Sequence, residues 1–368
     1  MTTSVPAPML RDGVEKIVGL EGMTLLHDTG NGTYHRISDL ASRIIDLFDG
    51  TRSIDDIADM INDCRFQGPR IGPEHVETLT RGLMKQQLLV GGTPRKRRRT
   101  GFDRMLPRFL LTTGFAGLLD PLVSALRPWY RTAPVTIAVL TSLLGYALGL
   151  TRIALAGMTR TAFDPEQTAI AALAALPIQL LAILLHESWH GIVAGLHDQP
   201  VRGLGVALMF WIIPVAYVDR TDAYRLRDRR PRVAIALAGM VNDGWVMGLT
   251  AVVAAWSTGL THQVAGTLAG YQLILLLANL NPLAPSDSVS AVEAVTGEVD
   301  LRGRARTMLV STLLHRPLLS YLSRLSTPRR TLYLWYGVLS HVFAVWIIAS
   351  AAWSIWNGIL TAARGVPR

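Results

Sequence analysis

Two histidines and a glutamate lie close together in the segment His186-Glu187-Ser188-Trp189-His190. On a helix, histidines at positions i and i+4 lie on one face, so both imidazoles can reach the same metal ion. Glu187 lies beside them, where it can take a proton from a water that the metal activates. With two histidines and a carboxylate as ligands, zinc keeps one position open for that water. The segment therefore predicts a zinc site for hydrolytic chemistry.

The third ligand of this site must come from elsewhere in the chain. Asp287 is the best candidate, because it follows an apolar stretch expected to end on the same side of the membrane as the histidines. Asp243, inside another apolar stretch, is the main alternative as third ligand. We expect it instead to contact a metal-binding side chain and hold it in position. We expect the other nearby acids to be solvated loop charges, namely Asp219, Asp222 and Glu293.

Long uncharged stretches surround these residues. Half of the chain is hydrophobic and only 17% is charged. A transmembrane helix needs about 20 apolar residues. The stretches of that length are Ala133–Thr151, Gln167–Leu185, Val233–Leu260, Gln263–Ser286 and Thr331–Ala363. Buried helices of a large soluble protein are the alternative, but so many runs favour a mainly α, multi-pass helical bundle of about five spans, with the histidines at the end of the second.

The arginines predict how this bundle lies in a lipid bilayer. Basic blocks at 95–99, 225–232 and 302–330 alternate with connections that are nearly free of charge. By the positive-inside rule, these blocks and the N-terminal residues are cytoplasmic, which leaves the C-terminal tail outside. No secretory signal pattern is seen at the N-terminus, so we expect residues 1–100 to stay where they are made. Cys64 is the only cysteine, which excludes internal disulfides and cysteine-based zinc binding.

The residues before the spans form a predicted α+β domain. A hairpin is expected over residues 22–38, around Thr29-Gly30-Asn31-Gly32. Helical periodicity follows in Asp39–Phe48, Ser53–Asn62 and Glu74–Lys85, and then comes the short apolar run Leu88–Val90. This order is typical of a winged helix. We therefore expect a winged-helix domain at 1–92, a basic linker with helices on the membrane surface at 93–130, and the membrane domain at 131–368.

Two segments resemble the signature of the site-2 protease family, namely the His186–His190 helix and Asn281-Pro-Leu-Ala-Pro-Ser-Asp287. The segment Phe210–Asp219 with Thr221, Asp222 and Ala223, then Arg232 and Ala238-Gly239, resembles the peptide zinc metalloproteases of ribosomal peptide pathways. The resemblance implies that His186, His190 and Asp287 hold zinc and that Glu187 is the catalytic glutamate. It also implies that Asn281 holds the substrate backbone. Ser286 and Ser288 stand where that family usually has Leu or Phe and Gly.

The N-terminal domain resembles the PqqD-like domains that bind the leader of a precursor peptide as an added strand. A DNA-binding winged helix is the alternative. Between residues 39 and 60, however, the chain carries Asp39, Asp46, Asp55, Asp56 and Asp59 against Arg43. Such a surface repels phosphate, so we expect no nucleic-acid partner.

Together these features predict an endopeptidase of the bacterial plasma membrane. Its expected substrate is a ribosomally made precursor peptide, and peptide-modifying enzymes are further partners that such a pathway implies. Cleavage of a membrane-bound anti-sigma factor or a signal-peptide remnant is a second enzymatic hypothesis. A non-proteolytic scaffold for peptide modification or export is a third.

Overall fold

The structure is a computed structural model. It describes residues 7–19, 22–30, 33–63, 70–91, 108–112, 114–132, 135–158, 165–199, 201, 203–209, 213–298, 300–318, 320–323 and 325–364. The chain divides into two compact units. One comprises Met1–Ala125 with Ala194–Pro231, and the other Leu126–Val193 with Arg232–Arg368. Each unit is described separately. The predicted division at residues 92 and 130 stays a prediction.

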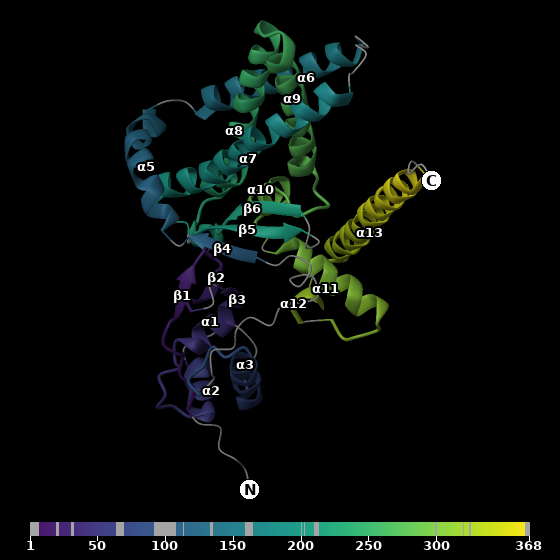
Figure 1. Ribbon diagram of the computed structural model, residues 1–368. Coiled ribbons are helices and arrows are strands. Elements are labelled where there is room, and N and C mark those ends of the chain that lie inside the picture. The colour runs from purple at the N-terminus through teal and green to yellow at the C-terminus, as the bar shows by residue number, and fades with distance from the viewer. Residues whose placement is uncertain are drawn as a thin grey trace. The chain divides into compact units, whose positions relative to one another are not determined.

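The N-terminal part of the first unit has three strands followed by three helices (Figure 1). The antiparallel sheet has the order β1 (Val14–Val18), β2 (Thr24–Asp28), β3 (Thr33–Arg36). The helices are α1 (Asp39–Ile45), α2 (Ile54–Asp63) and α3 (Pro73–Lys85). The predicted hairpin and helices are thus confirmed, although α1 ends earlier than expected. The sequence did not predict β1, and Leu89 forms only an isolated bridge to Leu10. The winged-helix assignment stays a prediction.

Side-chain caps define where the first two helices begin. The Ser38 hydroxyl oxygen accepts a hydrogen bond from the Ala41 amide at 3.1 Å. At α2, the Ser53 hydroxyl accepts from the Asp56 amide at 3.1 Å, and the Asp56 carboxylate accepts in return from the Ser53 amide at 3.1 Å. This reciprocal pair satisfies two amides that a helix start leaves without internal partners. It explains why the helix starts directly after Ser53.

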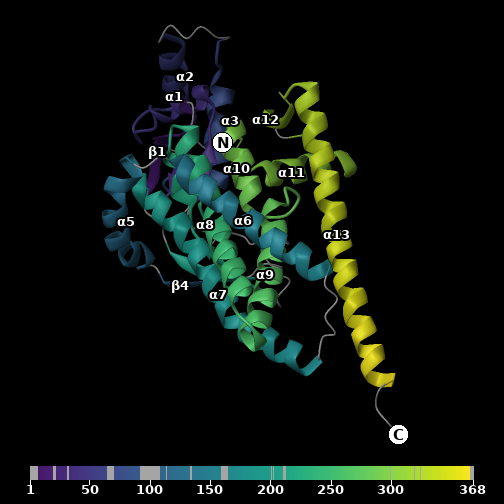
Figure 2. The ribbon, with the colours of Figure 1, turned by 90° about the horizontal axis from the view of Figure 1, so that it is seen from above.

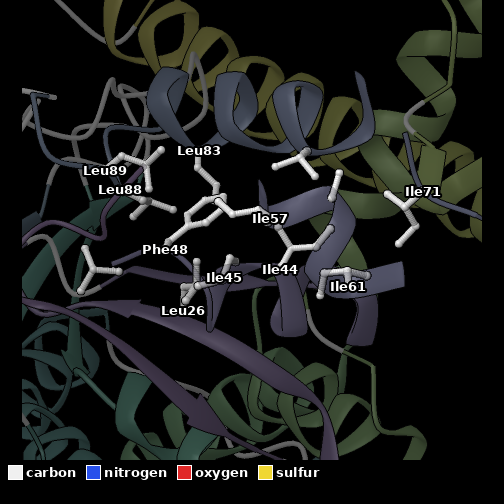
Figure 3. Packing of buried hydrophobic residues seen from close by; sticks show 13 residues of the cluster. Leu26, Ile44, Ile45, Phe48, Ile57, Ile61, Ile71, Leu83, Leu88 and Leu89 are labelled. Atoms are coloured by element: carbon white, nitrogen blue, oxygen red, sulfur yellow. The ribbon is translucent and has the colours of Figure 1, made fainter. Parts of the chain in front are cut away.

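The helices cover one face of the sheet and form an apolar core with it (Figure 3). Leu26 from β2 packs with Ile44 and Ile45 of α1, Ile57 of α2 and Leu83 of α3, and all five side chains are buried. Burying an aliphatic side chain of this size contributes about 1.5–3 kcal/mol. This core accounts for the order of the N-terminal part without any metal or disulfide.

The opposite face of the same sheet is polar and contacts the short helix η2 (Thr221–Arg225). Glu15, His27 and Tyr34 form one row across the three strands. The Tyr34 hydroxyl donates to the Asp222 carboxylate at 2.5 Å, and the Arg225 guanidinium lies 3.0 Å from His27 Nδ1. Burial, followed by the hydrogen bond to Asp222, raises the pKa of Tyr34 to about 12. Asp222 is buried in this contact, so the prediction that it is a solvated loop charge is wrong.

A second antiparallel sheet in the first unit has the order β4 (Arg108–Thr112), β5 (Leu204–Met209), β6 (Ile213–Val218). Helix α5 (Phe115–Thr132) follows β4. The expectation of membrane-surface helices within residues 93–130 is therefore wrong for β4, whereas α5 is helical. The reason is tertiary, because β4 pairs with β5, which comes much later in the chain. The basic linker around 95–99 lies outside the described residues.

Among the described residues, the second unit contains five helices that are long and apolar enough to cross a membrane. They are α6 (Val135–Met158), α7 (Pro165–Leu196), α8 (Arg229–Trp256), α9 (Gly259–Leu280) and α13 (Thr327–Arg364). Figures 1 and 2 show α6, α7, α8 and α9 gathered in one bundle. The shorter helices are α10 (Asp287–Thr296), α11 (Leu301–Leu313) and α12 (Ser320–Ser323), and α13 packs against α11. The predicted multi-pass character is thus supported by length and composition.

Two of the predicted span ends are wrong. Helix α7 continues to Leu196, so the two histidines lie within the helix and not at its end. Helix α9 ends at Leu280, well before the expected Ser286. The reason is the turn that follows it: the Asn281 side-chain oxygen accepts from the Leu283 amide at 2.9 Å, and Pro282 has no amide to continue the helix.

Small residues bring α6 and α8 into close contact. A Cβ added at Gly145 would overlap the backbone of Gly244, and one added at Gly248 would overlap Gly145. At the same crossing, the Tyr146 hydroxyl donates to the Met240 carbonyl at 2.7 Å. Close backbone approach through glycines is a common way for helices to associate in lipid, where apolar side chains gain little from leaving the solvent. The crossing helps to fix α8, which contributes several groups to the site described next.

Candidate metal centre

The two histidines lie on the buried stripe of α7. This stripe comprises Ala171, Ala175, Gln179, Ala182, His186 and His190, which recur at helical spacing. His186 Nε2 lies 3.3 Å from His190 Nε2, so both rings turn the same nitrogen toward one point. The ligand atoms of His186, Glu187 and His190 all lie within 4.8 Å of one another, and this group could hold a metal ion.

Asp287 reaches the same point from the start of α10. Its Oδ2 atom lies 3.0 Å from His186 Nε2 and 3.1 Å from His190 Nε2. The turn after α9 delivers it there: the Ser286 hydroxyl donates to the Asn281 carbonyl at 2.7 Å, and the same oxygen accepts from the Val289 amide at 3.4 Å. Ser286 thus caps α10 and holds the turn, which gives this departure from the family pattern a structural role.

Helix α8 contacts the Nδ1 atoms of the two imidazole rings. His186 Nδ1 lies 2.8 Å from Asp243 Oδ2, and His190 Nδ1 lies 2.6 Å from the Ile235 carbonyl oxygen. Partners of this kind fix the ring orientation and tautomer of metal-binding histidines. Asp243 and Asp287 therefore contact opposite nitrogens of His186. This geometry separates the two rival carboxylates, because only Asp287 faces both Nε2 atoms.

The hydrogen positions that these contacts require show whether a metal fits. A carbonyl oxygen can only accept, so His190 Nδ1 carries the proton, and in the neutral ring Nε2 then offers a lone pair. The same holds for His186 if Asp243 is ionised. Two nitrogen lone pairs and the Asp287 oxygen thus converge, with separations of 3.0, 3.1 and 3.3 Å. A shared proton can join only two of these atoms through a hydrogen bond, whereas a metal ion can bind all three.

The spacing of these three atoms also suits a small divalent ion. Ligands held at 2.0–2.1 Å in a tetrahedral site are about 3.3 Å apart. The residues are buried, and they bring carboxylates and imidazoles together inside apolar helices, where ionisable groups are expensive unless they are paired or bind a metal. The residues therefore fit a metal with nitrogen and oxygen ligands.

Gly239 allows His186 to lie against α8. A Cβ at this position would overlap Nε2, Cε1 and Cδ2 of the His186 ring. Gly239 lies one turn after Ile235 and one turn before Asp243, so the ring packs directly on the backbone between its own partner and that of His190. In the sequence, Ala238-Gly239 stands out only as part of the resemblance to the peptide zinc metalloproteases. The sequence feature that could have indicated the role of Gly239 is its place in the interior of an apolar helix.

Other predicted residues lie in different surroundings. Asn281 is half-buried, and the turn after α9 uses its side-chain oxygen, so its NH2 group is the part that could hold a peptide carbonyl. Glu293 on α10 accepts a hydrogen bond from the Leu301 amide at 2.8 Å. Burial raises the pKa of Glu293 to about 7, so the expectation of a solvated charge is wrong there too. Asp219 is half-buried, and its amide donates to the Gly203 carbonyl.

Comparisons of the chain with protein-family models, with curated proteins and with solved structures gave no match. The functional argument therefore depends on the geometry of the site.

We predict that Gly239→Ala weakens metal binding about 10–100-fold, the range found when partners behind a metal ligand are disturbed. The added methyl must push the His186 ring away from Asp243 and Asp287. Metal content after dialysis against a graded chelator series would measure this effect. Gly266→Ala in α9 is the matched control, because a Cβ there meets no atom within 4 Å. Equal metal retention in both variants would contradict the positioning role of Gly239.

Proposed function

We propose that this protein is an intramembrane zinc endopeptidase of the site-2 protease type. The observation that carries the proposal is the convergence of His186 Nε2, His190 Nε2 and Asp287 Oδ2 inside apolar helices. Two imidazoles and one carboxylate favour zinc over magnesium and calcium, which prefer oxygen ligands. The same combination of two histidines and one carboxylate is used by soluble zinc proteases, and it leaves a position open for the reaction.

The residues around this point have distinct roles in the proposed reaction. A zinc ion bound there would supply Lewis-acid polarisation of the scissile carbonyl and would acidify a water. Glu187 takes a proton from the attacking water and passes it to the leaving amine. Asp243 and the Ile235 carbonyl keep the two imidazoles in the tautomer that exposes Nε2. Asn281, through its NH2 group, holds a carbonyl of the substrate backbone.

The proposed substrate is a ribosomally made precursor peptide at the bacterial plasma membrane. The N-terminal domain supports this choice, because β1 and β3 are the edge strands of its sheet and an edge can accept an extended leader by strand addition. Holding the leader raises the local concentration of the precursor at a site with little selectivity among apolar segments. The N-terminal domain is proposed to be cytoplasmic, where peptide-modifying enzymes would act on the same precursor.

We predict that the purified protein holds about one zinc per chain and that the double variant His186→Ala, His190→Ala holds none. Asp287→Ala should weaken zinc binding more than Asp243→Ala, because Asp287 faces both Nε2 atoms while Asp243 faces only Nδ1 of His186. Elemental analysis would measure occupancy, with Asp219→Ala as the control. Full occupancy in the double variant would refute a histidine site. The reverse order of the aspartates would exclude Asp287 as the third ligand.

Glu187→Gln should keep the zinc and lose peptide cleavage by about 10²–10⁴-fold, because the amide cannot accept the proton. Cleavage of a reporter precursor, followed by mass spectrometry, would measure the loss. Ser188→Ala is a suitable neighbour control, since its hydroxyl donates to the Leu184 carbonyl in the preceding turn of the same helix. Near wild-type cleavage by Glu187→Gln would assign the chemistry to another carboxylate. Absence of cleavage by the unmodified protein would instead favour the scaffold hypothesis.

We further predict that the full-length protein binds the leader of a precursor encoded near its gene. The Glu187→Gln variant is the right protein for this titration, because it prevents turnover of the probe. A fluorescent leader peptide should bind saturably, whereas a scrambled leader and duplex DNA should not. Binding of DNA without binding of the leader would mean that the domain is a regulator. Binding of an anti-sigma segment instead would favour the second enzymatic hypothesis.

A further inference from the structure

A second polar layer lies inside the helical bundle. It consists of Gln179 on α7, Thr250 on α8 and Gln272 on α9, and we call these residues the glutamine layer. All are buried, with Gln179 at 8% and Gln272 at 6% exposure. Polar residues on the buried stripes of spanning helices are uncommon and usually mark a binding site or an interhelical contact. The metal centre does not use any of them.

The position of the glutamine layer follows from its spacing to the site. Gln179 precedes His186 and Thr250 follows Asp243, each by about two helical turns, or about 10.5 Å, and Gln272 is hydrogen-bonded to Thr250. Helices α7 and α9 run toward the metal centre and α8 runs away from it. The two offsets and this hydrogen bond therefore put all three residues on the same side of the centre. Between the two levels, the buried residues include Ala182 on α7 and Met247 on α8.

Hydrogen bonding within the glutamine layer is incomplete. The Gln272 NH2 group donates to the Thr250 hydroxyl oxygen at 3.0 Å, and that hydroxyl donates to the Val246 carbonyl at 2.8 Å. Among the described residues, no donor lies within hydrogen-bond distance of Gln272 Oε1 or Gln179 Oε1. An amide oxygen buried among apolar groups without a donor is strongly destabilising. Both oxygens therefore require a ligand that donates hydrogen bonds.

We propose that the glutamine layer binds water and forms a small hydrated site below the metal centre. The ligand must donate to two amide oxygens. The glutamine layer carries no ionised side chain to balance a bound ion, and backbone amides inside the helices are already used by the helices themselves. Water meets these conditions. The hydration does not depend on the proposed proteolysis. A role as the reservoir for the water that hydrolysis consumes does rest on that proposed function.

Cysteine accessibility tests the proposal without any measurement of peptide cleavage. Cys64 is the only native cysteine, so Cys64→Ser provides a background without thiols. In nanodiscs, Gln272→Cys should react with a small hydrophilic methanethiosulfonate at least tenfold faster than Ile274→Cys, because the reagent attacks the thiolate and a thiol ionises only where water reaches it. Ile274 lies on the same turn of α9 but is 66% exposed on the outer surface of the bundle. Gln179→Cys and Leu180→Cys form the equivalent pair on α7.

A third pair consists of Thr250→Cys and Leu249→Cys, and its buried substitution changes the side-chain volume least. This pair decides the outcome if a glutamine variant fails to fold. Slow reaction of the buried cysteines, at the rate of their outward-facing neighbours, would show that the glutamine layer is dry and would overturn the proposal. Equally fast reaction of every cysteine would overturn it as well, since the bundle would then be hydrated throughout. A dry layer would leave the proposed zinc chemistry untouched, because zinc content and cleavage are measured separately.

Discussion

Three lone-pair atoms, His186 Nε2, His190 Nε2 and Asp287 Oδ2, meet within 3.3 Å of one another inside an apolar bundle. In water such a cluster would be solvated at little cost, but within spanning helices ionisable groups are expensive unless they are paired or bind a metal. An aspartate at the centre of a span costs about 2.5–3.5 kcal/mol on insertion scales. The bundle bears this cost at Asp243, whose carboxylate orients the His186 ring. The candidate metal site is therefore the constraint to which the surrounding structure is adapted.

Helix α8 shows how that constraint is met. It supplies the Ile235 carbonyl to one imidazole and the Asp243 carboxylate to the other, and Gly239 lets the His186 ring lie against its backbone. Its position is fixed in turn by the glycine crossing with α6, where side chains larger than hydrogen would force the helices apart. The candidate ligands come from α7 and α10, and α8 orients the two histidines among them. A ring displaced slightly at Gly239 would lose partners on both of its nitrogens.

The sequence was sufficient for the parts of this site that depend on local spacing. Histidines at i and i+4 and long apolar runs carry their own periodicity, so the α7 site and the spanning helices could be predicted. The ends of those helices depend on single turns, such as the one at Asn281 that stops α9 at Leu280. Strand β4 was missed because its partner β5 is distant in the chain, and Asp222 and Glu293 were misjudged because their burial comes from tertiary contacts. The role of Gly239 could not be predicted from the sequence, because it depends on where the His186 ring lies.

The N-terminal sheet limits how the proposed leader peptide could bind. One face packs on α1, α2 and α3, and on the other face the row Glu15–His27–Tyr34 contacts Asp222 and Arg225. Every residue of β2 is buried, as expected for a central strand covered on both faces. A peptide that lay on either face would have to displace the apolar core or break the part-buried Tyr34–Asp222 hydrogen bond. Addition at the edge of β1 or β3 requires neither, because main-chain groups of an edge strand point sideways. Strand addition is therefore the binding mode with the lowest structural cost.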